Sequence, residues 1–166
     1  MERAKQSRPS TLRPERLRLG SALRRAWVGY QRLLEGEMAR AGVERRGFPD
    51  GRVLHLCARS SEVTISRIGR ELGITRQGAS KVVGALRQQG FVTLHPSPDD
   101  GREKLVRLTT SASAYLGAQQ EAAGVIERRL KAEIGPDALE ALYGLLDALG
   151  TDDQPRLRDY LHHRLM

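Results

Sequence analysis

The sequence has little of what marks several common classes of protein. Only one of its 166 residues is a cysteine, so no disulfide can form within the chain. No apolar run approaches the roughly eighteen residues that a membrane-spanning helix needs, and the first residues lack the apolar stretch of a secretory signal. Aromatic residues make up 4%, so the core must be built from Leu, Val, Ile and Ala. We therefore expect a cytoplasmic, mainly helical protein of one domain with extensions.

Basic residues, in contrast, are abundant and unevenly distributed. The net charge is +8 and the isoelectric point is near 10.3, which favours a polyanionic partner. Residues 1–25 contain eight basic and two acidic residues, residues 61–109 are net positive, and residues 110–166 are net negative. We interpret residues 1–13 as a flexible arm, which either follows DNA phosphates or a minor groove or is a solvated tail.

The segment 63–109 contains the pattern around which the chain is organised. A first helix is expected to begin after Thr64, a capping residue, and to end at Gly73. A second helix should begin after Thr75 and end at Gly90. Two helices joined by so short a turn predict a helix-turn-helix, whose second helix enters the major groove of DNA.

Two short strands are expected directly after these helices. Residues 91–95 and 104–108 are rich in strand formers, and the turn residues 96–101 connect them. Residues 62–63 are a candidate for a small third strand. A β-hairpin after the second helix makes the motif a winged helix-turn-helix.

The wing carries a resemblance to a known family. Asp100-Gly101-Arg102, then five intervening residues and Leu108-Thr109, resemble the wing pattern of the MarR family of bacterial transcription regulators. The resemblance implies a mainly α fold with a small β-wing, flanked by N- and C-terminal dimerisation helices. One departure is Arg67-Ile68-Gly69, where the family usually has Glu-Leu-Ala.

Apolar stripes outside the winged helix favour a homodimer. A long helix is expected over residues 14–41, a short one over residues 49–60, and two more over residues 111–134 and 136–149. Packing within one chain is the alternative, but it would leave Leu-rich surface exposed. The stripe expected for the third of these helices consists of Leu116, Ala123, Ile126, Leu130 and Ile134.

These features divide the chain into five segments. They are a basic flexible arm (1–13), an N-terminal dimerisation helix and loop (14–48), a winged helix-turn-helix DNA-binding domain (49–109), C-terminal dimerisation helices (110–150), and a tail with a candidate short helix (151–166).

The second helix of the helix-turn-helix has a face suited to DNA, because its outward side chains are short, polar or cationic and none is acidic. Arg76 and Lys81 can donate to guanine, and Gln77 can pair with adenine. Thr75 and the first-turn amides can face a phosphate, and Gly78 permits close approach. The candidate DNA-binding residues are Arg67, Thr75, Arg76, Gln77, Gly78, Ser80, Lys81, Arg102 and Lys104.

The wing supplies the remaining candidates. Arg102 at its tip would enter the minor groove, where narrow A-tracts attract arginine. By the resemblance, Asp100 holds this arginine in place. Lys104 and Arg107 are candidates for phosphate contacts, and Arg67 in the first helix is another.

The resemblance also implies a small aromatic or anionic effector, bound between the dimerisation helices and the DNA-binding part. Trp27, Tyr30 and His55 are the first candidates, and His55 is expected to be partly buried. Cys57 is interpreted as a buried, inert thiol, with a redox sensor as the alternative. No cofactor or metal ligand set is expected, and no pattern of catalytic residues indicates an enzyme.

Taken together, the sequence predicts a sequence-specific transcription regulator that binds double-stranded DNA as a homodimer. By the resemblance, it would be a repressor that binds a palindromic operator and is released by a small molecule. Two alternatives remain open. One is a winged-helix adaptor that binds protein partners, and the other is a weakly specific architectural DNA-binding protein.

Overall fold

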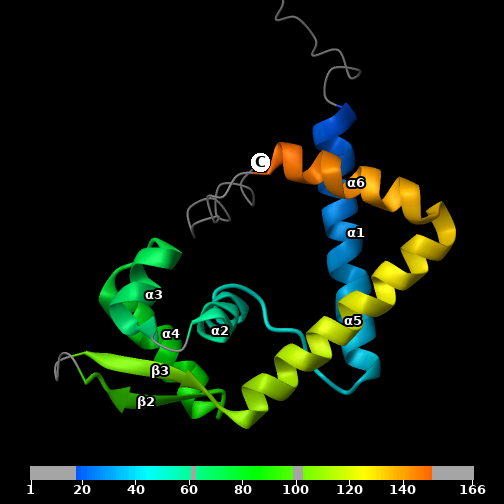
Figure 1. The fold of residues 1–166 in the computed structure, drawn as a ribbon. Helices are drawn as coiled ribbons and strands as arrows, with labels where there is room; N and C mark the ends of the chain where they lie inside the picture. The colour runs from blue at the N-terminus through cyan, green and yellow to red at the C-terminus, as the bar shows by residue number, and fades with distance from the viewer. Residues whose placement is uncertain (1–17, 61–62, 99–102, 151–166) are drawn as a thin grey trace, which may run out of the picture.

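The computed structural model describes residues 18–60, 63–98 and 103–150. Within these ranges the mainly helical fold with a small β-wing is confirmed, and Figure 1 shows its arrangement. None of the described helices has both the length and the apolar character needed to cross a membrane. The elements are α1 (Arg18–Arg40), α2 (Asp50–Arg59), β1 (Val63–Thr64), α3 (Ile65–Leu72), α4 (Arg76–Gln88), β2 (Val92–Pro96), β3 (Lys104–Leu108), α5 (Thr110–Ile134) and α6 (Pro136–Leu149).

The elements gather in two parts that α5 joins. Helices α2, α3 and α4 lie with the sheet at one end of the molecule, and α1, α5 and α6 extend away from them (Figure 1). The core of buried side chains lies mainly in the first part and continues along α5. Helix α1 contributes Leu34 and Met38 to it, both near its C-terminal end.

The helix-turn-helix has the predicted caps. Thr64 Oγ1 accepts a hydrogen bond of 3.1 Å from the backbone N–H of Arg67, and Thr75 Oγ1 accepts one of the same length from Gly78. Gly73 ends α3 with a φ of 66°, a left-handed conformation that glycine adopts without strain. Such local hydrogen bonds satisfy the first amides of each helix.

The wing is a three-stranded antiparallel sheet in the order β1-β3-β2. Val106 of β3 is the partner of Val63 on one side and of Leu94 on the other. The third strand expected at residues 62–63 is formed by Val63–Thr64. Its valine is fully buried, so this short strand anchors the sheet to the core.

The fully buried residues of helix α5 lie beside the predicted apolar stripe. They are Ala112, Tyr115 and Ala122, and mostly small side chains let α5 approach α1 and α2 closely. Three members of the expected stripe, Leu116, Ala123 and Ile126, are partly buried against the same core. In all, four members of the stripe are half-buried, and Ile134 is exposed.

Large apolar side chains remain exposed on the part of the molecule built by α1 and α6. Even Trp27 is 57% exposed. Neither the winged part nor the other described residues cover these side chains. They are Leu19, Trp27, Val28 and Leu33 on α1, and Tyr143, Leu145, Leu146 and Leu149 on α6.

Candidate nucleic-acid interface

Helix α4 has one buried and one exposed face, as the sequence predicted. Ala79, Val83 and Leu86 are fully buried against the rest of the winged helix. The exposed residues include Arg76, Gln77, Ser80, Lys81 and Arg87. Because the helix contains no acidic residue, its exposed face carries cations and neutral polar groups and no charge that would repel a polyanion.

The need for glycine differs between two positions in this motif. A Cβ at Gly78 would lie 3.4 Å from Thr75 Oγ1 and 3.6 Å from Ile74 Cδ1, which are ordinary contacts. At buried Gly69, a Cβ would lie only 3.1 Å from the backbone oxygen of Ile74. The tight approach of α3 to the turn thus depends on Gly69, whereas packing within the chain does not require Gly78.

An acidic residue adjoins α4, and its contact with this helix was not predicted from the sequence. Glu103, just before β3, places its Oε1 3.4 Å from Arg76 Nη2 and accepts a hydrogen bond of 2.6 Å from Ser66 Oγ of α3. The exposed face of α4 is itself free of acids, but its surroundings are not. The only signal in the sequence was an acid beside the wing, and nothing indicated its contact with α4.

The basic residues of the wing lie on one strand. Lys104 and Arg107 of β3 are both exposed, and they pair in register with Pro96 and Thr93 of β2. The predicted tip residues, Arg102 and Asp100, lie outside the described residues. The described part of the wing thus carries two exposed cations on β3, and they point to opposite faces of the sheet because their positions differ by three.

Arg67 lies differently from the other candidates. It is half-buried, and its Nη1 donates a hydrogen bond of 3.1 Å to Ser60 Oγ at the end of α2. Its guanidinium is also close enough to Cys57 to oppose the effect of burial on the thiol. In this conformation Arg67 contacts α2 rather than standing out from α3.

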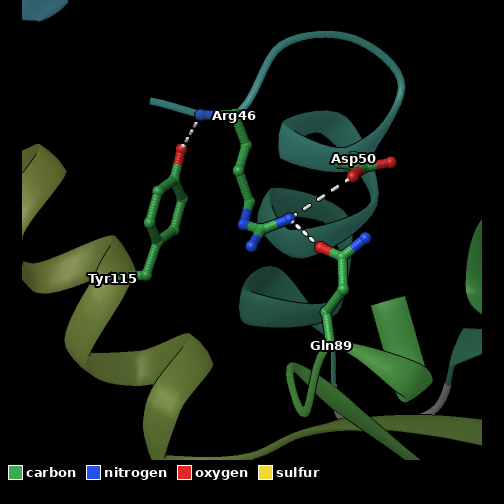
Figure 2. A network of polar contacts seen from close by, with 4 residues as sticks. All are labelled: Arg46, Asp50, Gln89 and Tyr115. Atoms are coloured by element: carbon green, nitrogen blue, oxygen red, sulfur yellow. Dashed lines mark hydrogen bonds and ion pairs between the residues drawn. The ribbon is translucent and has the colours of Figure 1, made fainter. Parts of the chain in front are cut away.

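Arg46, in the loop between α1 and α2, connects the winged helix to α5. Figure 2 shows its guanidinium between Asp50 of α2 and Gln89 at the end of α4. The ion pair with Asp50 measures 3.6 Å, and the Arg46 guanidinium also lies 3.8 Å from the centre of the Phe91 ring. Its backbone N–H donates a 3.0 Å hydrogen bond to Tyr115 of α5. One residue thus fixes the C-terminal end of α4 relative to α5.

The comparisons with known proteins place this geometry in a family. A model of the MarR family matches residues 42–103, which include α2, α3, α4 and β2. Within residues 42–103 the chain is similar to the winged helix-turn-helix of the MarR family. The resemblance that the wing pattern indicated is therefore confirmed.

Individual relatives of this chain agree with the match. An uncharacterized protein of Mycobacterium tuberculosis is 35% identical to this chain over 79 residues. The match covers 48% of this chain and 55% of the relative, so the chain spans about half the length of the curated relatives it matches. The transcriptional repressor CouR, in a structure bound to a 23-mer DNA duplex, is 26% identical with a TM-score of 0.64 over 84% of this chain and 99% of its own. A mutant MarR from E. coli, complexed with operator DNA, shares the fold at 22% identity and a TM-score of 0.64, over 86% of this chain and all of its own.

The segment that matches the family model buries the chain's single cysteine. Cys57 lies among the core residues of α2, and burial raises the pKa of its thiol to about 11, although the Arg67 guanidinium lowers it in part. A thiol that stays protonated at neutral pH is a poor nucleophile. This supports the interpretation of Cys57 as an inert core residue.

The structure brings together two of the three effector candidates. Trp27 and Tyr30 stack on α1 with their ring centroids 6.1 Å apart. His55 is exposed on α2, so the expectation that it is partly buried was wrong. The face of α2 that turns inward is filled by Val53, Leu54 and Cys57, which leaves no room for the histidine.

Two surface hollows lie away from these candidates. One of about 280 Å³ is lined by residues around Arg45, Arg46 and Asp50. The other, of about 430 Å³, follows the first turns of α1 at Arg18 to Arg25. None of the effector candidates lines either hollow. No cluster of three or more metal-binding side chains occurs in the described ranges.

Proposed function

We propose that this protein is a cytoplasmic, sequence-specific transcription regulator that binds a palindromic DNA operator as a homodimer. The observation that carries the proposal is the exposed, acid-free face of α4, which lies opposite a fully buried face. The exposed basic residues of β3 add to it. A helix of this kind fits the major groove, and a wing at its side meets the phosphates that flank the groove.

CouR supports DNA binding by this protein and also repression as the direction of regulation. It is a repressor bound to a DNA duplex, and this chain matches almost all of it at 26% identity. By this likeness, we propose that the present protein also represses transcription. The winged helix at residues 49–109 then binds DNA, and residues 14–48 and 110–150 form the dimer.

The proposed contacts follow from the chemistry of each side chain. Arg76 and Lys81 donate to guanine, Gln77 pairs with adenine, and Ser80 contacts a base or phosphate. Gly78 allows the helix to approach the groove, since packing within the chain does not require it. The other proposed contacts are Arg67, Thr75, Arg102 and Lys104, with Asp100 orienting Arg102.

The homodimer is proposed from the exposed apolar side chains of α1 and α6. A surface of this kind is unfavourable in water unless something covers it, and a two-fold partner offers a matching face. Dimerisation would also set two copies of α4 about one turn of DNA apart, roughly 34 Å, so that both reach the major groove on one side of the duplex.

We also propose that a small aromatic or anionic compound releases the DNA. Trp27 and Tyr30 are the proposed contacts, since they stack on α1 and Trp27 is exposed while Tyr30 is half-buried. His55 is retained only as a more distant candidate. Such a compound acts if it prefers a dimer whose α4 spacing does not fit DNA. Quenching of the emission of Trp27, the only tryptophan, by benzoate as a probe would test this, and an unchanged emission would count against it.

The decisive experiment selects duplexes from a random library with the full chain and then measures binding of the variants. Arg76→Ala should relax the base preference at one position, at a cost of about 1–3 kcal/mol on the preferred sequence. Arg102→Ala should weaken binding to all sequences and lower the salt slope by about 1.

The controls come from the same measurements. Glu121→Gln, on the exposed surface of α5, should change neither property. Equal binding to all duplexes would indicate an architectural protein, and no binding would indicate an adaptor. If both arginine variants bind like the wild type, the proposed interface is wrong.

A further inference from the structure

Glu103 stands where the wing meets the two helices of the helix-turn-helix. Its carboxylate contacts Ser66 of α3 at 2.6 Å and Arg76 of α4 at 3.4 Å. Its side chain is only 21% exposed, whereas that of Arg76 is 59% exposed. The carboxylate is therefore held by the protein, and the arginine reaches from it toward solvent.

This position is costly for an acid. The second carboxylate oxygen, Oε2, is buried without a hydrogen-bond partner among the described residues, and an unsatisfied buried acceptor destabilises a fold. An ion pair with so exposed an arginine returns little stability. A negative charge beside a DNA-binding helix also repels phosphate. Stability and general affinity for DNA thus both argue against Glu103, so its role must be of another kind.

We propose that Glu103 is a specificity-determining residue that positions Arg76 for one base pair, which rests on the DNA-binding function proposed above. Arg76 is the first residue of α4, and residues at the N-terminal end of a recognition helix contact base edges. Glu103 fixes the direction of its guanidinium before DNA arrives. Ser66 fixes Glu103 in turn.

The chemistry of the guanidinium permits this arrangement. A guanidinium has five N–H donors in a planar fork, so a carboxylate at Nη2 does not use up its capacity to donate to guanine O6 and N7. Holding the side chain in one orientation lowers the conformational entropy that binding must remove. The carboxylate also penalises any register in which Arg76 leaves it for a phosphate. Both effects increase the difference between the correct and a wrong sequence.

The test is Glu103→Gln in the full chain, which keeps the side-chain size and an acceptor for Ser66 but removes the charge. The base position that Arg76 reads is identified as the one where Arg76→Ala loses its preference. At this position, Glu103→Gln should reduce the preference for the best base about fivefold or more. Binding to an unrelated duplex should instead become several-fold tighter. Glu121→Gln makes the same change of charge on α5 and should leave both values unchanged.

A double-mutant cycle separates a positioning role from a structural one. If Glu103 acts through Arg76, Glu103→Gln should not alter base preference in an Arg76→Ala background. This inference would be wrong, and the proposed function unaffected, if Glu103→Gln kept the base preference that Arg76→Ala loses. An equal effect of Glu103→Gln in both backgrounds would also overturn the inference, because this would mean that Glu103 only holds the wing on α3. A wild-type protein without any sequence preference would overturn the proposed function as well.

Discussion

At the scale of single residues, Cys57 gives a prediction that depends on pH. Burial raises the pKa of its thiol from 9.0 to about 11 in the folded protein. The folded state therefore holds this proton more tightly than the unfolded chain does. The resulting stabilisation is complete below about pH 9 and is lost as the pH rises through about 11. Two pKa units correspond to at most about 2–3 kcal/mol.

We expect the free energy of unfolding in urea to show this loss when the wild type is compared with Cys57→Ala. The difference between the two proteins should shrink between pH 9 and pH 11, while other titrating groups cancel. A thiol reagent at pH 8 should label the native protein far more slowly than the urea-unfolded one. Rapid labelling of the native protein would show that Cys57 is accessible and would reopen the sensor interpretation.

The roles of single residues could be predicted where their contacts are with residues close in the sequence. The caps Thr64 and Thr75 each bond an amide three residues ahead, so the sequence order alone indicates them. Glu103 meets Arg76 only after the chain has passed through β2 and the wing. No periodicity carries this information. His55 was misjudged because three apolar neighbours on α2 compete for the inward face.

At the scale of elements, Arg46 makes the orientation of α4 a testable property. Its contacts with Asp50, Gln89 and Phe91 join α2 and the end of α4 to the loop after α1 (Figure 2). Arg46→Ala removes a cation–π contact and a half-buried ion pair, so we expect a loss of about 1–2 kcal/mol in stability. Amide hydrogen exchange should increase at residues 86–91, because the end of α4 is no longer fixed.

Arg46→Lys is the matched control for the geometry. Lysine keeps the charge for Asp50 but lacks the planar group that stacks on Phe91, so it should restore only part of the stability. Arg40→Ala removes an arginine whose partner is Glu37 on the surface of α1 and should change little. If Arg46→Ala exchanges its amides like the wild type, Arg46 does not hold α4.

The elements show where a periodic pattern is sufficient and where it is not. The order and approximate bounds of the helices and strands followed from spacing, caps and glycines. The most buried residues of α5 did not, because the small side chains of Ala112 and Ala122 are fully covered, whereas the larger Leu116 and Ile126 are only partly buried against the core. Of the predicted stripe, Ile134 is the member with an exposed large apolar side chain.

At the scale of the whole molecule, the exposed side chains of α1 and α6 predict a concentration-dependent dimer. If a second copy covers Trp27, its emission should shift to shorter wavelength as the protein concentration increases, because the indole leaves water. Sedimentation should show the molecular mass doubling over the same range. Leu146→Glu places a charge within the apolar surface and should shift the equilibrium to the monomer, since burial of an unpaired charge is costly.

Ala58→Glu makes the same kind of change at an exposed position of α2 and should leave the dimer intact. The two variants then connect assembly to recognition. A monomer presents one α4 to one half-site, so Leu146→Glu should lose most of its affinity for a palindromic duplex but keep the weaker binding to a single half-site. A Leu146→Glu protein that remains dimeric would place the interface elsewhere. A wild type that stays monomeric while binding the whole palindrome tightly would show that the spacing of two helices is not what reads the DNA.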